Sequence, residues 1–167
     1  MSEIVNRVAQ SKLITFDLED LYPKGERVIL DIKDWLYEGI ILREKEFRKH
    51  LEEHDWTMYK DAYVALTCST DAVIPGWAYM LVASKLNPYS KKVVIGSLED
   101  LELSLYQTLL EALDVSEFRD KPVIIKGCSN KPVPENAYIL AISKIQQVAK
   151  SVMYGEACSS VPLFKKK

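Results

Sequence analysis

Residues 63–96, YVALTCSTDAVIPGWAYMLVASKLNPYSKKVVIG, decide the fold of this chain. The first six residues (63–68) and the last six (91–96) are short apolar runs, which predict two buried strands. Between them, PGWAYMLVASKL (75–86) predicts a helix opened by Pro75, because proline is tolerated at the first helical position. A strand, a helix and a second strand in this order are typical of an α/β protein with a parallel sheet.

The same alternation continues on both sides of this segment. The sequence predicts strands at 28–36, 122–128 and 151–156 and helices at 40–54, 98–113 and 134–149. We expect residues 1–27 to form an N-terminal arm with a short helix and residues 156–167 to form a C-terminal tail. Residues 1–167 are therefore expected to be a single α/β domain with a mostly parallel sheet of about five strands and helices on its faces.

The middle of the chain is similar to its last third. A shift of 59 residues aligns Asp55 with Asp114, Asp61 with Asp120, Pro75 with Pro134, Tyr79 with Tyr138, and Gly96 with Gly155. We interpret residues 35–96 and 94–155 as pseudo-repeats, which predicts a tandem duplicated α-β-α-β unit.

The composition is that of an ordinary soluble globular protein. The 167 residues are 48% hydrophobic and 28% charged, which excludes a disordered chain and a disulfide-dense mini-protein. Lys and Arg number 22 and Asp and Glu number 24, so the net charge is −2. A near-neutral chain has no broad positive field, and we expect no nucleic-acid partner. The run Lys165–Lys167 is expected to be a solvated tail.

The location and the cofactor class follow from what the sequence lacks. The N-terminus has no signal-peptide core and no stretch is long enough to span a membrane, so a cytoplasmic protein without a membrane partner is expected. Three cysteines cannot all pair, which favours reduced thiols. No phosphate-binding glycine loop occurs, so no nucleotide cofactor is predicted. No GxSxG elbow occurs either, so an α/β-hydrolase serine is unsupported.

The cysteines are the candidate functional residues. Cys68 and Cys128 each follow a predicted strand and precede a helix, and Cys158 follows the last predicted strand. If all strands are parallel, the three thiols lie at the carboxyl edge of one sheet, where α/β proteins bind ligands. A nearby helix N-terminus lowers the pKa of a thiol, and thiolates bind soft metals or act as nucleophiles.

Three functions remain open for these thiols. The first is an accessory protein that binds zinc, iron or an iron–sulfur cluster through Cys68, Cys128 and Cys158, with Asp71 as the best fourth ligand and Glu156 as a weaker one. Asp71 could equally cap the following helix. The second is a thiol-based redox or sulfur-transfer enzyme, and the third is a structural adaptor with buried, inert cysteines. Whether the protein is an enzyme stays open, as does its oligomeric state.

A metalloprotease pattern is present but is rejected. His50-Leu51-Glu52-Glu53-His54 fits the HxxEH arrangement, with two histidines one helical turn apart. The same helix is an ordinary charged surface with i, i+4 pairs, and the repeat places leucines opposite both histidines. In the other copy of the repeat, these positions are therefore expected to serve packing.

Four stretches carry a resemblance to a known family. They are REKEFR (43–48), CSTDAVIPGWAYML (68–81), KGCSNKPVP (126–134) and MYGEACSSVPLFKK (153–166). With them the chain resembles, over its full length, an uncharacterised bacterial family catalogued as domain of unknown function 2480. The resemblance brings no established activity. It implies an association with iron–sulfur cluster assembly, with assembly proteins as partners, and so favours a metal or sulfur role for the cysteines.

Overall fold

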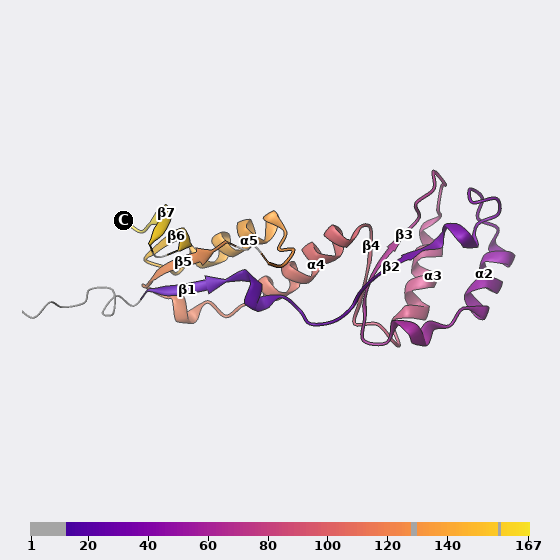
Figure 1. Ribbon diagram of the computed structural model, residues 1–167, viewed down its shortest axis with the longest axis horizontal. Coiled ribbons are helices and arrows are strands. Elements are labelled where there is room, and N and C mark those ends of the chain that lie inside the picture. Colours follow the sequence, from indigo (N-terminus) through magenta and orange to yellow (C-terminus); the bar gives the residue numbers. More distant parts are fainter. Residues whose placement is uncertain (1–12, 128–129, 157) are drawn as a thin grey trace, which may run out of the picture. The chain divides into compact units, whose positions relative to one another are not determined.

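The computed structural model of the chain describes residues 13–127, 130–156 and 158–167. The chain divides into two compact units, whose elements are labelled in Figure 1. Pro23–Ser104 forms one unit, which we call the inserted unit. Met1–Tyr22 and Leu105–Lys167 together form the other, which we call the split unit because the inserted unit interrupts it in the sequence.

The inserted unit is built on a sheet of three parallel strands in the order β2-β3-β4. Its elements are β2 (Arg27–Asp31), η2 (Ile32–Trp35), α2 (Glu44–Glu53), η3 (Trp56–Tyr59), β3 (Tyr63–Thr67), α3 (Gly76–Leu86) and β4 (Lys92–Ile95), followed by the first part of α4 (Leu98–Glu111). Val28, Val64 and Val93 are in register across the sheet. The central strand β3 is buried along its middle, which explains its unbroken apolar sequence.

The core of the inserted unit lies between this sheet and two helices. Helix α2 contributes Phe47 and Leu51, which are one turn apart, as the sequence predicts. Helix α3 contributes Ala78, Val82 and Leu86 to the same cluster. Both helices therefore cover one face of the sheet, as Figure 1 also shows.

The split unit contains a sheet of four strands in the order β1-β5-β6-β7. Its elements are β1 (Ile14–Asp17), η1 (Leu18–Leu21), the second part of α4, η4 (Ser116–Phe118), β5 (Pro122–Lys126), α5 (Glu135–Ile145), β6 (Ser151–Glu156) and β7 (Ser159–Lys165). The first three strands are parallel, and β7 is antiparallel to β6. The mostly parallel arrangement agrees with the sequence prediction.

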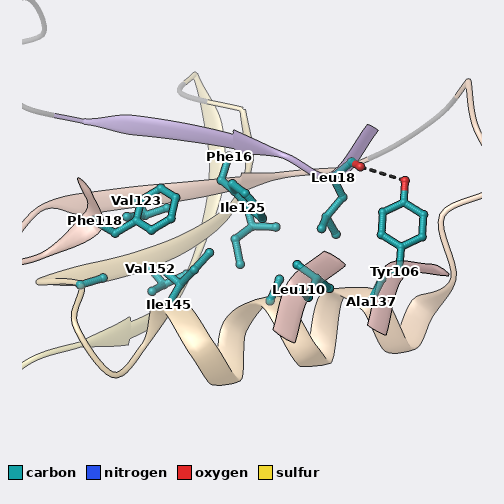
Figure 2. Close-up of a cluster of buried hydrophobic side chains, with 12 residues drawn as sticks. Phe16, Leu18, Tyr106, Leu110, Phe118, Val123, Ile125, Ala137, Ile145 and Val152 are labelled. Carbon is teal, nitrogen blue, oxygen red and sulfur yellow. Dashed lines mark hydrogen bonds between the residues drawn. The ribbon is translucent and has the colours of Figure 1, made fainter. Parts of the chain in front are cut away.

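The core of the split unit joins this sheet to α4 and α5 (Figure 2). Val123 and Ile125 of β5 pack with Ala137, Ala141 and Ile145 of α5. In the same core, the hydroxyl of the fully buried Tyr106 donates a hydrogen bond of 2.8 Å to the carbonyl oxygen of Leu18 (Figure 2). This bond satisfies the one polar atom of a large aromatic side chain in an apolar environment.

The prediction of one sheet with about five strands is wrong. The described residues form seven strands in two separate sheets. Strand β1 lies in the segment predicted to be an arm (1–27), and β7 lies in the predicted tail (156–167). Single-sequence patterns identify strands, but they do not tell which strands pair. The boundary of a single domain over residues 1–167 stays a prediction.

The helices agree with the sequence except at their ends. Pro75 and Pro134 lie one residue before the first helical residue and not at it, since α3 begins at Gly76 and α5 at Glu135. Helix α5 ends at Ile145, before the predicted end at residue 149. Among the described helices, none has the length and apolar character needed to cross a membrane.

Candidate functional site

The carboxyl ends of β2 and β3 place a carboxylate and a thiol at the same edge of the three-stranded sheet. Asp31 is the last residue of β2, and Cys68 directly follows β3. Asp31 Oδ1 accepts hydrogen bonds from the backbone N–H of Lys33 (3.0 Å) and of Ser69 (3.2 Å). The Asp31 carboxylate thereby connects the start of η2 to the loop that follows β3.

The Cys68 thiol is half-buried and has its partners within its own loop. Its Sγ lies 3.4 Å from Thr70 Oγ1 and 3.8 Å from the Thr70 carbonyl oxygen, to which the thiol donates. The side chain also packs against the core of the inserted unit. These contacts describe a thiol held in place by its loop.

Two ionisable side chains at this edge have shifted pKa values. Burial raises the pKa of Tyr79 on α3, and electrostatic interactions with the nearby Cys68 and Asp31 raise it further. Burial alone would raise the pKa of Asp31, but the hydrogen bonds from Ser69 and Lys33 outweigh it and hold this pKa below the ordinary value of 3.8. The phenol therefore stays neutral and the carboxylate stays charged at neutral pH.

The structure contradicts the predicted metal site. That prediction needed Cys68, Cys128 and Cys158 at one sheet edge, with Asp71 nearby. The two described cysteines follow strands of different sheets, and Cys128 lies outside the described residues. Asp71 is exposed. In the part of the chain that the structure describes, no group of three or more His, Cys, Asp or Glu side chains could hold a metal ion. The proposed metal or iron–sulfur function is therefore wrong.

The two alternative functions of the cysteines gain no support from the described residues. Cys68 and Cys158 are free thiols, so the described residues contain no disulfide that would mark a redox pair. Cys158 is exposed, whereas the adaptor hypothesis required buried, inert cysteines. The error came from the assumption that all strands share one sheet, because that assumption alone brought the three thiols together.

The two histidines of the rejected protease pattern lie in different environments. His50 is exposed on α2. His54 packs edge-on between Trp35 and Trp56, and its Nε2 lies 2.8 Å from Tyr59 Oη. Burial lowers the pKa of His54, which favours the neutral ring at neutral pH.

A shallow groove with an apolar floor lies between α2 and α3 on the surface of the inserted unit. It has a volume of about 390 Å³ and is lined by Glu44, Arg48, Trp77, Met80 and Leu81. The first two residues belong to α2 and the other three to α3. Volumes of this size are typical of sites that take a small molecule or a few side chains of a peptide.

Trp77 is the fixed part of this groove. Its ring packs edge-on against the buried Phe47, with 6.1 Å between the ring centroids. The Arg48 guanidinium lies 5.8 Å from the Trp77 ring centroid, and Arg48 Nε donates to Glu44 Oε1 at 3.1 Å. Met80, by contrast, is 68% exposed although it is a large apolar side chain. The groove therefore combines an anchored aromatic ring, a polar rim and an adaptable thioether.

Comparison with known proteins identifies the family. A family model described as "Protein of unknown function (DUF2480)" matches residues 2–166. The chain belongs to this family. The match confirms the resemblance carried by the four stretches of sequence. No curated protein and no solved structure matches the chain.

Sequence analysis of this DUF2480 protein missed the groove, although a signal for it exists. Helix α3 reads GWAYMLVASKL, and its apolar residues occur on all sides of the helix. A helix that packs on one sheet needs only one apolar face, so the surplus apolar residues indicate a further contact. Helix α5 has the same length as α3, with the exposed Ile139 at its fifth residue, where α3 has Met80, but Asn136 at its second residue, where α3 has Trp77.

Proposed function

We propose that this DUF2480 protein is a binding module that holds a helical segment of a partner protein in the groove between α2 and α3. The observation that carries the proposal is the pairing of Trp77 and Met80, two large apolar side chains at 36% and 68% exposure in the floor of one groove. Exposed apolar side chains grouped in a concave site are typical of interaction surfaces.

The chemistry of the groove favours an apolar ligand with polar flanks. Trp77 offers a flat ring with little freedom, because Phe47 and Arg48 contact it. Met80 is flexible and polarizable, which suits ligands of varied shape. Glu44 and Arg48 neutralise each other at the rim, so a strongly charged ligand gains little there.

The shape of the groove favours a helix over an extended strand. Its walls are two helices, and the lining residues span one turn of each, about 6 Å along the axis, which matches one turn of a bound helix. No strand lines the groove, so an extended peptide would find no backbone edge to pair with. We infer that the ligand is an amphipathic helix that presents apolar side chains at i and at i+3 or i+4 to the groove.

The test is selection of helical peptides from a displayed library on the full-length protein. We expect enriched peptides with that apolar spacing. Met80→Glu should weaken their binding by at least about tenfold, because it places a charge in the apolar floor. Ile139→Glu is the matched control, since Ile139 holds the same position on α5 and is 62% exposed. It should leave binding within about twofold of the wild type.

The outcome that contradicts the proposal is equally definite. If no helical peptide is enriched, or if Met80→Glu and Ile139→Glu have equal effects on binding, the groove is not the binding site. Thermal unfolding of both variants checks that the folded state is kept.

We also propose that the two units descend from one duplicated element. Several local features recur at a spacing of 59 residues, as the sequence alignment predicts. Asp61 and Asp120 both have positive φ (59° and 57°), and Gly96 and Gly155 do as well. Asp17 and Asp31, outside the aligned segments, each cap a short 3-10 helix directly after a strand. These recurring backbone features support the proposed duplication.

A further inference from the structure

A cluster of basic side chains lies at one edge of the four-stranded sheet of the split unit, the edge formed by the amino ends of its parallel strands. The parallel strands β5 and β6 begin at this edge, directly after Lys121 and Lys150. Strand β7 runs antiparallel and therefore ends there, at Lys165. The topology thus gathers lysines that are far apart in the sequence.

The C-terminal lysines are part of this edge. Lys165 ends β7 and pairs with Ser151, and the backbone N–H of Lys166 donates to the Lys150 carbonyl oxygen at 2.9 Å. The side chains of Lys165 and Lys166 are exposed, as expected of a solvated segment, but their backbone is paired with β6 and Lys150. The backbone N–H of Lys150 donates in turn to the Lys121 carbonyl oxygen at 2.9 Å. Lys121, Lys150 and Lys166 are consecutive members of one hydrogen-bonded row.

The charge at this edge is locally unbalanced. Residues 117–121, 150 and 165–167 contain six basic side chains (Arg119, Lys121, Lys150, Lys165, Lys166 and Lys167) and two acidic ones (Glu117 and Asp120). The backbones of Lys121, Lys150 and Lys166 lie at the ends of neighbouring strands about 4.8 Å apart, a spacing below one Debye length, so their like charges repel. A ligand with clustered negative charge would relieve this repulsion.

One lysine at this edge already forms an ion pair with a carboxylate of the same chain. Lys166 Nζ lies 3.2 Å from Asp120 Oδ1, and both side chains are exposed. Within the described residues, Lys150 and Lys165 are exposed and take part in no ion pair. Their ammonium groups are available to further carboxylates in the same way.

We propose that this edge, residues 119–121, 150 and 165–167, binds a short acidic peptide segment of a partner protein. A nucleic acid is a poorer fit, because Phe118 and Phe164 pack in or against the core and offer no ring for base stacking. An extended anionic membrane is also a poorer fit, because the whole chain has a net charge of −2. A short peptide meets only the local positive charge. This surface is separate from the helical groove of the inserted unit and does not rest on it.

The test is fluorescence anisotropy with a labelled peptide of alternating Glu and Ser, using the full-length protein at low salt. We expect saturable binding that weakens as salt is added. The triple variant Lys150→Gln, Lys165→Gln, Lys166→Gln should lose at least about tenfold in affinity. A matched triple variant, Lys45→Gln, Lys60→Gln, Lys85→Gln, removes three exposed lysines of the inserted unit and the same net charge. It should retain affinity within about twofold.

Three outcomes overturn the proposal. The first is no binding of the peptide by the wild-type protein at low salt. The second is an equal loss of affinity in both triple variants, which would mean that only net charge matters. The third is tighter binding of a single-stranded oligonucleotide or of phosphatidylglycerol vesicles than of the peptide, which would assign the edge to a different partner class. Thermal midpoints equal to that of the wild type show that both variants are folded.

Discussion

Asp31 connects two segments of the inserted unit through one carboxylate. Replacing it with alanine removes the hydrogen bonds to the backbone of Lys33 and Ser69. We expect a loss of about 1–2 kcal/mol in the free energy of unfolding, measured by urea denaturation at pH 7. Asp34→Ala is the control, because Asp34 is exposed in the same short helix, and its effect should be within about 0.5 kcal/mol.

The pH dependence of this effect has a definite sign. The folded-state pKa of Asp31 is lowered below the ordinary value of 3.8, so its charged form stabilises the folded protein. The stabilisation is fully present above pH 3.8 and is lost as the pH falls through the lower, folded-state pKa. The difference between wild type and Asp31→Ala should shrink over that window. A difference that stays constant or grows toward acid pH would contradict the assigned hydrogen bonds.

Gly155 and Gly96 are backbone positions where a side chain is not tolerated. Gly155 has φ +116°, and a Cβ added there would lie 2.6 Å from the Ser159 carbonyl oxygen. Gly96 has φ +134°, and its added Cβ would collide with the Asp100 carboxylate. Each Gly→Ala change should therefore cost about 2–4 kcal/mol in the free energy of unfolding.

Gly76 supplies the control for this pair. It lies at the start of α3 and an added Cβ meets nothing within 4 Å, so Gly76→Ala should be neutral or stabilising by up to about 1 kcal/mol. Calorimetric melts of the three Gly→Ala variants measure these changes in stability. If only one of the positive-φ glycines proves sensitive, the two positions are not equivalent and the proposed duplication loses support.

At the scale of elements, one ion pair ties strand β2 to helix α4 within the inserted unit. Arg27 Nε lies 2.6 Å from Glu102 Oε1, and the side chains are only 11% and 6% exposed. Arg27 also donates to the carbonyl oxygens of Pro23 and Gly25. Removing the guanidinium leaves a buried carboxylate without this cation. Arg27→Ala should therefore cost about 3–5 kcal/mol in the free energy of unfolding.

An exposed pair on α2 is the reference for this prediction. Lys49 and Glu53 lie 3.8 Å apart and are 74% and 63% exposed, so Lys49→Ala should cost no more than about 0.5 kcal/mol. Chemical denaturation of both variants gives the comparison. Similar losses in the two variants would mean that the Arg27 pair is solvated and does not fasten α4 to the sheet.

The sequence predicts the elements of the fold better than their arrangement. The buried run at 63–68 becomes β3, and the run at 151–156 becomes β6 with the predicted bounds. Strand β1 was missed because it is four residues long and its partner, β5, lies far along the chain. Local periodicity carries no information about such a pairing. A clue was present, since ITFDLED (14–20) and VILDIKD (28–34) are alike and both lead from a strand into a 3-10 helix.

The candidate site illustrates the same limit. Cys68 does follow a strand at the carboxyl edge of a parallel sheet, as the sequence predicts. The Asp31 carboxylate of the neighbouring strand binds the backbone N–H of Ser69 beside it, which the sequence reasoning did not predict. The three-cysteine site fails because it depends on how sheets assemble. The groove at Trp77 and Met80 depends on which apolar side chains the core leaves uncovered, and only the packed structure reveals this.

At the scale of the whole molecule, the central claim is that this DUF2480 protein binds a partner helix at α2 and α3. The most direct measurement is a proton–nitrogen correlation spectrum of the three tryptophan indoles during titration with a peptide from the selection. We predict that the indole signal of Trp77 shifts progressively to saturation. The signal of Trp56 should stay in place, because its indole N–H is buried and donates to the Leu51 carbonyl oxygen at 2.8 Å. A peptide that binds while the Trp77 signal remains unchanged would contradict the account.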